Sequence, residues 1–396
     1  MHIPSFELAR QPRIVFGDGS LNKVPALASL YGRRALLVTG AGSFLNTAHG
    51  ENFIKTMQSA NFGIETFTVV GEPSPKLVDT AVNAFRGNNI EVVIGIGGGS
   101  VLDAAKAIAG LLRVSNSVMD FLEGVGPELP YAGPSVPFIA VPTTAGTGSE
   151  ATKNAVLSVQ GPHGFKKSFR HEILLPEYAV LDPELLATCP PALIAANSMD
   201  ALTQLLESYV STKANPYTDA LAISGIGMVR EGLFIWHDNT ERAAEGRSMM
   251  QYAALLSGIT LAQVGLGSVH GLAAPLGAFF PIPHGVACGT LVGTCSAMNI
   301  RALKQHSPGH PALAKYAIAG KVLVRDMALD NQAGCEVLLK LLDDWTQQLE
   351  LPRLSSYGMS KEDIPRVVKN CRGNSMKTNP VLLEDTEIAE ILLARL

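Results

Sequence analysis

One segment of this 396-residue chain constrains the fold more than any other, and it reads EVVIGIGGGSVLDAAKAIAG over residues 91–110. A short apolar run (91–96), typical of a buried strand, leads into glycines, and a helical pattern follows over 101–112. Side-chain-free residues let backbone N–H groups approach a pyrophosphate, and a helix N-terminus adds a favourable field. The segment therefore predicts either a nucleotide-binding loop or a tight strand-to-helix turn without a ligand.

Strand-like and helix-like patterns alternate around this segment. Further strands are predicted at 35–39, 64–70 and 138–142, and further helices at 51–60 and 78–85. Alternation with short links is typical of a parallel sheet with helices on both faces. The first half of the chain is thus predicted to be a Rossmann-like α/β domain.

The pattern changes near Pro190, beyond which long apolar-periodic segments dominate and β-branched runs nearly vanish. These segments span 193–210, 219–236, 248–263, 332–349 and 386–393. Because a chain of this length usually exceeds one hydrophobic core, two domains are expected. We place an α/β dinucleotide-binding domain at residues 1–186 and an all-α domain that carries the metal and the chemistry at residues 187–396.

Composition excludes several classes of protein. The chain is 47% hydrophobic and 17% charged, with a net charge of −4 and no basic block, so it does not resemble a disordered or nucleic-acid-binding protein. It has no signal-peptide pattern at the start, and no apolar run is long enough to span a membrane. Five cysteines without a C-x-x-C spacing suit free thiols in a reducing cytoplasm, and they predict no zinc–thiolate site.

A second loop, VPTTAGTGSEAT over residues 141–152, follows the strand predicted at 138–142 and carries several hydroxyl side chains. Two polar, glycine-bearing loops at neighbouring strand ends form the kind of crevice that holds nucleotides in doubly wound sheets. Ser100 is expected to cap the helix after the glycines, with Asp103 as its capping-box partner. The two loops together favour the nucleotide interpretation over the plain turn.

The end of the early strand bears on the choice of cofactor. After residues 35–39 the chain continues Gly40-Ala41-Gly42-Ser43, without the carboxylate that would bind a ribose 2′-hydroxyl and repel a 2′-phosphate. Gly40 removes the repulsive group, and Ser43 or nearby N–H groups could donate to phosphate. This favours NADP(H) over NAD(H), or acceptance of both.

Asp200, His270 and His284 are the candidate metal ligands and the candidate catalytic residues. Asp200 lies in a strongly apolar helical pattern, where a carboxylate is costly to bury unless it is paired or bound to a metal. Both histidines lie in apolar, glycine-rich sequence, and carboxylate and imidazole ligands suit a divalent ion such as Fe²⁺ or Zn²⁺. Gln204 shares the helix face of Asp200. The alternative is that each histidine is a hydrogen-bonded core residue.

Taken together, these segments resemble the iron-containing, or group III, alcohol dehydrogenase family. The similar stretches are EPSP (72–75), GIGGGSVLDAAKAIA, VPTTAGTGSEAT, LLPEYAVLDPEL, MDALTQLLES, HGLAAPLGAFFPIPHGVACG and Asn379-Pro380. The resemblance implies a dehydroquinate synthase-like fold, a homodimer, and catalysis between the two domains. It also implies that cofactor contacts come from Gly98, Gly99, Ser100, Asp103, Thr143, Thr144, Thr152 and Lys166.

The chain departs from the family pattern at two positions. The usual fourth metal ligand is a histidine four residues after the aspartate, and here it is Gln204, a weaker ligand. A second familiar histidine, four residues after His270, is Ala274. The site is therefore expected to hold its metal with three firm ligands, and proton transfer to pass through water and the cofactor ribose. The alternative is that the substrate supplies the missing polar group.

The leading prediction is reversible hydride transfer between a small alcohol or aldehyde and NADP(H) or NAD(H), assisted by a divalent metal. The alternative is a nucleotide-binding family member whose metal site has degenerated and that has little or no dehydrogenase activity. A lyase of the dehydroquinate synthase type would share the nucleotide and the metal, but it needs basic residues for a phosphorylated substrate, and the sequence offers none. Neither a nucleic-acid nor a membrane partner is expected.

Overall fold

The computed structural model describes residue 3, residues 5–42 and residues 44–396, so Ser43 lies outside the described residues. The chain forms two compact units. An α/β unit contains Arg10–Val159 and Lys166–Cys189, and a helical unit contains the residues before Arg10, Gln160–Phe165 and Pro190–Leu396. Each unit is described by itself below.

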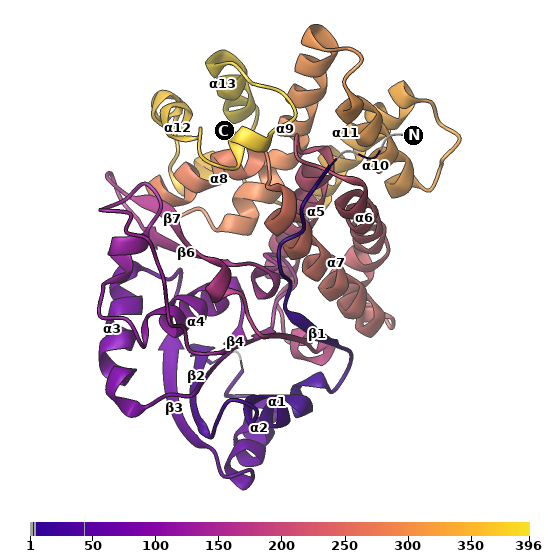
Figure 1. Ribbon diagram of the computed structural model, residues 1–396. Helices are drawn as coiled ribbons and strands as arrows, with labels where there is room; N and C mark the ends of the chain where they lie inside the picture. The colour runs from indigo at the N-terminus through magenta and orange to yellow at the C-terminus, as the bar shows by residue number, and fades with distance from the viewer. Residues whose placement is uncertain (1–2, 4, 43) are drawn as a thin grey trace. The chain divides into compact units, whose positions relative to one another are not determined.

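The α/β unit is built on a six-stranded parallel sheet of order β1-β8-β5-β4-β2-β3. Figure 1 shows β2, β3 and β4 side by side, as their pairing requires. The strands are β1 (Arg13–Phe16), β2 (Arg34–Gly40), β3 (Gly63–Val69), β4 (Val92–Gly97), β5 (Phe138–Pro142) and β8 (Tyr178–Leu181). A separate two-stranded sheet pairs β6 (Asn154–Val159) with β7 (Phe165–Arg170).

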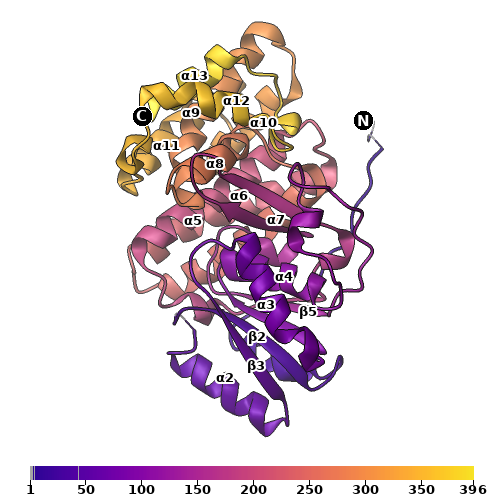
Figure 2. The ribbon, with the colours of Figure 1, turned by 90° about the vertical axis from the view of Figure 1, so that its left-hand side faces the viewer.

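The helices of this unit are α1 (Val24–Ala28), α2 (Ala48–Ser59), α3 (Pro75–Phe85) and α4 (Gly99–Leu111). Helix α4 packs against β4, β5 and β2, and it lies beside α3 (Figure 2). A methyl group added at Gly95 in β4 would lie 2.9 Å from Ala105 Cβ, so this glycine lets α4 approach the sheet closely. The buried strands and α4 thus form the core beneath the glycine turn.

The second unit is helical. Its helices are α5 (Pro191–Val210), α6 (Pro216–His237), α7 (Ala243–Val264), α8 (Ser268–Phe279), α9 (His284–His306), α10 (Pro311–Val324), α11 (Asn331–Gln348), α12 (Ile364–Asn370) and α13 (Asp385–Ala394). Helix α5 is buried along nearly its whole length and packs against α6, α7 and α9. It is therefore the central helix of the unit.

Helix α9 is the one described helix long and apolar enough by itself to cross a membrane, but 78% of its apolar window is buried within the fold. Its apolar surface is accounted for by contacts with α5, α8, α11 and α13. We therefore interpret α9 as a core helix.

The predicted α/β-plus-helical architecture is confirmed, and the ends of the predicted elements lie within five residues of the observed ends. The sequence analysis did not identify β1, β6, β7, β8, α1, α8, α9, α10 or α12. The predicted helix cap is wrong: α4 begins at Gly99 after an N-cap at Gly98, without a side-chain cap. Asp103 is held elsewhere, because it accepts hydrogen bonds from Ser149 Oγ (2.5 Å) and Val156 N (3.1 Å).

Candidate functional site

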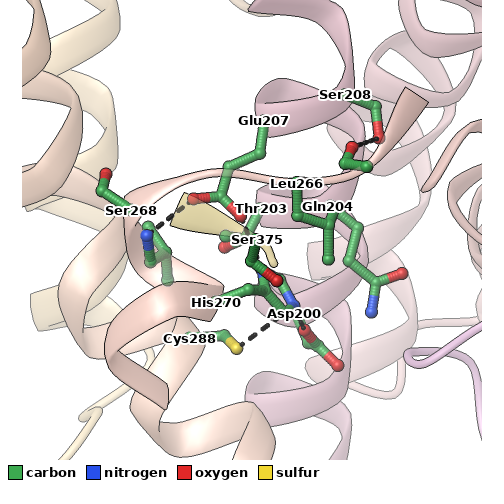
Figure 3. Close-up of polar contacts among 12 residues, drawn as sticks. Asp200, Thr203, Gln204, Glu207, Ser208, Leu266, Ser268, His270, Cys288 and Ser375 are labelled. Carbon is green, nitrogen blue, oxygen red and sulfur yellow. Dashed lines mark hydrogen bonds and ion pairs between the residues drawn. The ribbon is translucent and has the colours of Figure 1, made fainter. Parts of the chain in front are cut away.

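Three helices of the helical unit bring the predicted metal ligands together. Asp200 lies in the middle of α5, His270 in the first turn of α8, and His284 at the first residue of α9. Asp200 Oδ1 is 3.3 Å from His270 Nε2 and 3.9 Å from His284 Nε2. Cys288, which the sequence analysis did not single out, completes a group whose ligand atoms all lie within 4.8 Å of one another. Figure 3 shows Asp200, His270 and Cys288 in this group.

Glycines allow these helices to approach closely enough for the group to form. A methyl group at Gly285 in α9 would lie 2.7 Å from the Ala196 carbonyl oxygen of α5, and one at Gly289 would lie 2.9 Å from Met199 Cβ. Contacts this short leave no room for a side chain, so both glycines hold α9 against α5. The packing therefore sets the distance between His284 and Asp200.

The chain bends by 100° between α7 and α8, and this bend directs His270 toward α5. At Gly265, φ is +74°, a backbone conformation that favours glycine. The N-terminus of α8 is then fixed by buried acceptors: Ser268 N donates to Asn379 Oδ1 (3.0 Å) and Val269 N donates to Glu207 Oε1 (2.6 Å). This buried network fixes the start of α8 and therefore the position of His270.

Glu207 sets the orientation of the His270 ring. Its Oε2 lies 2.6 Å from His270 Nδ1, and because an ionised carboxylate only accepts, Nδ1 donates the hydrogen bond. The other ring nitrogen, Nε2, then faces Asp200 and Cys288. A carboxylate that holds a histidine in this way is a frequent partner of metal-bound imidazole. Sequence could have pointed to Glu207, since it lies two helical turns after Asp200 on the same face.

Asp200 has no hydrogen-bond partner in the described part of the chain, although its side chain is only 1% exposed. The two imidazole nitrogens are close to it, but they are not aligned as donors. A buried carboxylate without donors is costly unless a cation is near. The Asp200 oxygen and the two imidazole nitrogens converge with their lone pairs, and such a set of ligand atoms fits a divalent metal.

The electrostatics of the group favour positive charge. Burial opposes ionisation of Asp200, but His284 and His270 outweigh it and hold the pKa of this carboxyl below its usual value. Burial would lower the pKa of His270, yet Cys288, Asp200 and Glu207 raise it well above its ordinary value. Burial also raises the pKa of the Cys288 thiol to about 12.

Gln204 and Ala274 stand at the two positions where the family pattern has histidine. Gln204 Oε1 accepts a hydrogen bond from Ser257 Oγ at 2.8 Å, so the amide oxygen is engaged within the helical core. Ala274 lies one turn after His270 in α8 and carries no group that could relay a proton. Imidazole is therefore missing from both places.

In the α/β unit, the two predicted loops lie side by side at the ends of adjacent parallel strands. Strands β4 and β5 are paired, and Thr143 N donates to Gly97 O at 3.0 Å. A methyl group at Gly98 would lie 3.2 Å from Thr144 Oγ1, and one at Gly99 would lie 2.7 Å from Thr147 Oγ1. A side chain at Gly99 would therefore clash with the hydroxyl-bearing loop, and one at Gly98 would press against it.

The other predicted cofactor residues are held by internal contacts. Lys166 forms an ion pair with Glu72, and Thr152 Oγ1 accepts from Lys106 Nζ at 3.0 Å. Ser100 lies in the first turn of α4, whose N-terminus has no side-chain cap, and Gly40 ends β2. An uncapped helix N-terminus beside hydroxyl groups fits a phosphate. The roles of these residues stay predictions.

Lys106 was missed by the sequence analysis, although it is central to the loop. Its side chain is fully buried, and Nζ donates to Ser149 O, Asn154 O and two hydroxyls at 2.8–3.1 Å. Burial lowers the pKa of this lysine to about 8, against the opposing effect of Asp103 and Glu150. It fastens the 149–154 segment to α4 and so shapes the second loop.

Comparison with known proteins identifies the family. The family profile described as "Iron-containing alcohol dehydrogenase" matches residues 11–183, and the profile described as "Fe-containing alcohol dehydrogenase family, C-terminal" matches residues 194–396. The chain belongs to the iron-containing alcohol dehydrogenase family. Members of this family use a nicotinamide dinucleotide and a divalent metal, so the predicted family, enzyme class and cofactors are confirmed.

Similar proteins of this family match nearly the whole chain. Alcohol dehydrogenase 4 of Saccharomyces cerevisiae is 31% identical over 387 residues, with 96% of each chain covered. NAD-dependent methanol dehydrogenase of Bacillus methanolicus is 30% identical, with 96% of this chain and 97% of that protein covered. NADPH-dependent butanol dehydrogenase of Clostridium saccharobutylicum is 30% identical, with 90% and 87% covered.

The fold agrees with that of solved structures. A 1,3-propanediol oxidoreductase superposes with a TM-score of 0.89 at 26% identity, with 99% of this chain and 100% of that chain covered. The chain is thus a metal-dependent oxidoreductase of this family, which transfers hydride between a small alcohol or aldehyde and NADP(H) or NAD(H).

Proposed function

We propose that Asp200, His270 and His284 hold the divalent metal of this enzyme and that the Gly97–Ser100 turn holds the cofactor pyrophosphate. The observation that carries the proposal is the buried Asp200 carboxylate, which lacks a hydrogen-bond donor among the described residues but is faced by two imidazole nitrogens at 3.3 and 3.9 Å. The His284 side chain is 28% exposed, so the group is accessible from that side. A small alcohol or aldehyde would reach the metal there.

The protein's own residues prepare this chemistry. Bound metal polarises the substrate oxygen, and the nicotinamide carries the hydride. Glu207 keeps the proton of His270 on Nδ1, so that Nε2 stays available as a ligand atom. Burial of Asp200 and Cys288 excludes water from the inner side of the group, which strengthens every electrostatic interaction there. Because Ala274 cannot move a proton, water and the cofactor ribose are left to carry it.

We further propose that NADP(H) is accepted at least as well as NAD(H). Strand β2 ends at Gly40, and the described residues that follow, Ala41 and Gly42, bring no carboxylate to this end of the sheet. The relatives include both an NAD-dependent and an NADPH-dependent enzyme. Gly40→Asp tests this proposal: KM for NADPH should rise at least tenfold while KM for NADH stays within about threefold, because an added carboxylate repels only the 2′-phosphate. An equal rise for both cofactors would contradict it.

The substrate class proposed here is small primary alcohols and their aldehydes, since the relatives act on methanol and butanol by name. A homodimer and a cytoplasmic location complete the proposal and rest on the family resemblance and the free cysteines. The domain limits, 1–186 and 187–396, are likewise proposed.

The decisive experiment combines metal analysis with turnover. Purified protein loaded with Fe²⁺ or Zn²⁺ should bind one equivalent and oxidise NADPH or NADH with a panel of short aldehydes. Asp200→Ala and His284→Ala should lose both the metal and the activity, whereas the exposed His49→Ala should keep both. Tight nucleotide binding without stoichiometric metal or turnover would instead favour the degenerate-site alternative, which Gln204 and Ala274 motivate.

A further inference from the structure

Cys288 is the fourth member of the converging group, and no predicted role explains it. It lies one helical turn after His284 in α9 and is fully buried. Its Sγ is 3.5 Å from His270 Nε2 and 3.8 Å from His284 Nε2. The thiol is therefore directed at the same two ring nitrogens that face Asp200.

These separations match those of a four-ligand metal site. Metal–ligand bonds of about 2.0–2.3 Å in a tetrahedron place neighbouring nitrogen, oxygen and sulfur ligands about 3.3–3.6 Å apart. The observed distances between 3.3 and 3.9 Å, for the two nitrogens against Oδ1 and Sγ, need only small contractions to reach that geometry. An ion bound by Asp200, His270 and His284 would thus have a sulfur within reach.

The residue that the family pattern places at the fourth position is less suitable. Gln204 offers a neutral amide oxygen, and that oxygen accepts a hydrogen bond from Ser257. A thiolate carries a full negative charge and is a preferred ligand of zinc and other thiophilic ions. Of these two side chains, Cys288 is therefore the stronger ligand for a metal ion.

We propose that Cys288 is the fourth ligand of the metal, in place of the histidine replaced by Gln204, and that the site therefore prefers zinc to iron. The inference rests on the proposed function, since it requires that Asp200, His270 and His284 hold an ion. On binding, the S–H bond breaks, a sulfur–metal bond forms and the proton leaves to solvent, without any change of oxidation state. It replaces the expectation from cysteine spacing that the chain has no zinc–thiolate site.

Cobalt substitution tests the proposal without relying on activity. The full-length protein, freed of metal by a chelator, is titrated with Co²⁺ while the near-ultraviolet and visible spectra are recorded. A thiolate ligand gives a sulfur-to-cobalt charge-transfer band in the near ultraviolet, which a site of oxygen and nitrogen ligands lacks. The wild-type protein and Cys295→Ser should both show the band, and Cys288→Ser should lose it. Cys295 is the matched control because it is a buried thiol on the same helix.

Three results of the cobalt titration would contradict the proposed role of Cys288. One equivalent of bound Co²⁺ without the band in the wild-type protein would overturn the role of Cys288 but leave the three-residue site standing. A band that persists in Cys288→Ser would also overturn it. Failure of wild-type protein to bind Co²⁺ or Zn²⁺ would overturn the proposed function together with this inference.

A measurement on the unaltered protein covers the case in which Cys288→Ser does not fold. X-ray absorption of the zinc-loaded wild-type enzyme should show one sulfur at about 2.3 Å beside nitrogen and oxygen ligands at about 2.0–2.2 Å. A first shell of nitrogen and oxygen alone would contradict the proposal.

Discussion

At the scale of single residues, the orientation of the candidate ligand side chains depends on neighbours outside the candidate metal group. Glu207 accepts from both His270 Nδ1 and Val269 N, so one carboxylate fixes a ring and the start of the helix that carries it. Replacing it leaves the ligands in place but frees the ring to turn. Replacing Glu207 should therefore lower the affinity for metal more than it lowers the stability of the fold.

Glu207→Gln should weaken metal binding by about 10–100-fold, because the amide keeps the size of the side chain but not the charge that fixes the His270 tautomer. Competitive chelator titration measures the change, and thermal unfolding of the metal-free protein shows whether the fold survives. Glu245→Gln, an exposed residue paired with Arg242, is the control and should leave the affinity unchanged. Equal affinities for wild-type and Glu207→Gln would show that Glu207 does not position the ring.

Lys106 gives a second prediction at this scale. Burial lowers its pKa to about 8 in the folded protein, from the ordinary 10.5. Between pH 8 and pH 10.5 this lysine is protonated in the unfolded chain but not in the folded one, so the free energy of unfolding rises with pH. The gain in stability is complete above pH 10.5 and is lost as the pH falls through 8. The stability of wild-type relative to Lys106→Met should therefore increase from pH 8 to pH 10. Urea unfolding at each pH measures it, with the exposed Lys340→Met as control; a constant or falling difference would refute the prediction.

At the scale of elements, the candidate metal group forms because three helices pack closely at small residues. A methyl group at Gly285 would lie 2.7 Å from a carbonyl oxygen of α5, whereas one at Gly293, two turns further along α9, has no neighbour closer than 3.7 Å. Alanine at these two positions of the same helix is therefore expected to have opposite effects on stability.

Gly285→Ala should destabilise the protein by about 1–3 kcal/mol, since it forces α9 away from α5, and it should also weaken metal binding. Gly293→Ala should be neutral or more stable by about 0.5–1 kcal/mol, because alanine favours the helix and meets no clash. Chemical denaturation and metal titration of both variants check this pair. Similar losses in both would mean that close α5–α9 packing does not position His284.

The same helices show what sequence patterns could and could not predict. Strands β2 to β5 were predicted because buried parallel strands read as short continuous apolar runs, and α5, α6 and α11 because their apolar periodicity is long. Helices α8 and α9 were missed because Gly271, Pro275, Gly285 and Gly289 interrupt that pattern, although these residues suit the close packing. The three candidate ligands were singled out by residue type, but Cys288, Glu207 and Lys106 were not, since their contacts are with residues far away in sequence.

At the scale of the whole molecule, the two units differ in what they need for stability. Among the described residues of the helical unit, the buried Asp200 carboxylate has no hydrogen-bond donor, so we expect the stability of this unit to depend on a bound cation. In the α/β unit, the strongly buried Lys106 already has its acceptors within the fold. Removal of the metal should therefore lower the stability of the helical unit and leave that of the α/β unit unchanged.

Chelation should lower the melting temperature of the helical unit, since an ion present at about 100 times its Kd stabilises the state that binds it by about 2.7 kcal/mol. Limited proteolysis with and without chelator locates the change, with new cuts expected within residues 190–396 and none within 10–159. In Asp200→Asn the buried charge is gone, so chelator should have no effect on melting. A chelator response that persists in Asp200→Asn would place the stabilising ion elsewhere.

The four-residue spacing along α5 and α9 has an evolutionary consequence. Gln204 follows Asp200 by one turn, and Cys288 follows His284 by one turn, so two different helices each offer a position for one more donor to the same ion. A lineage can lose a donor on one helix and gain one on the other by point mutations, without insertions or a shift of the backbone. The same backbone could therefore present a different set of donor side chains to an ion, and metal preference would then change without any change of fold.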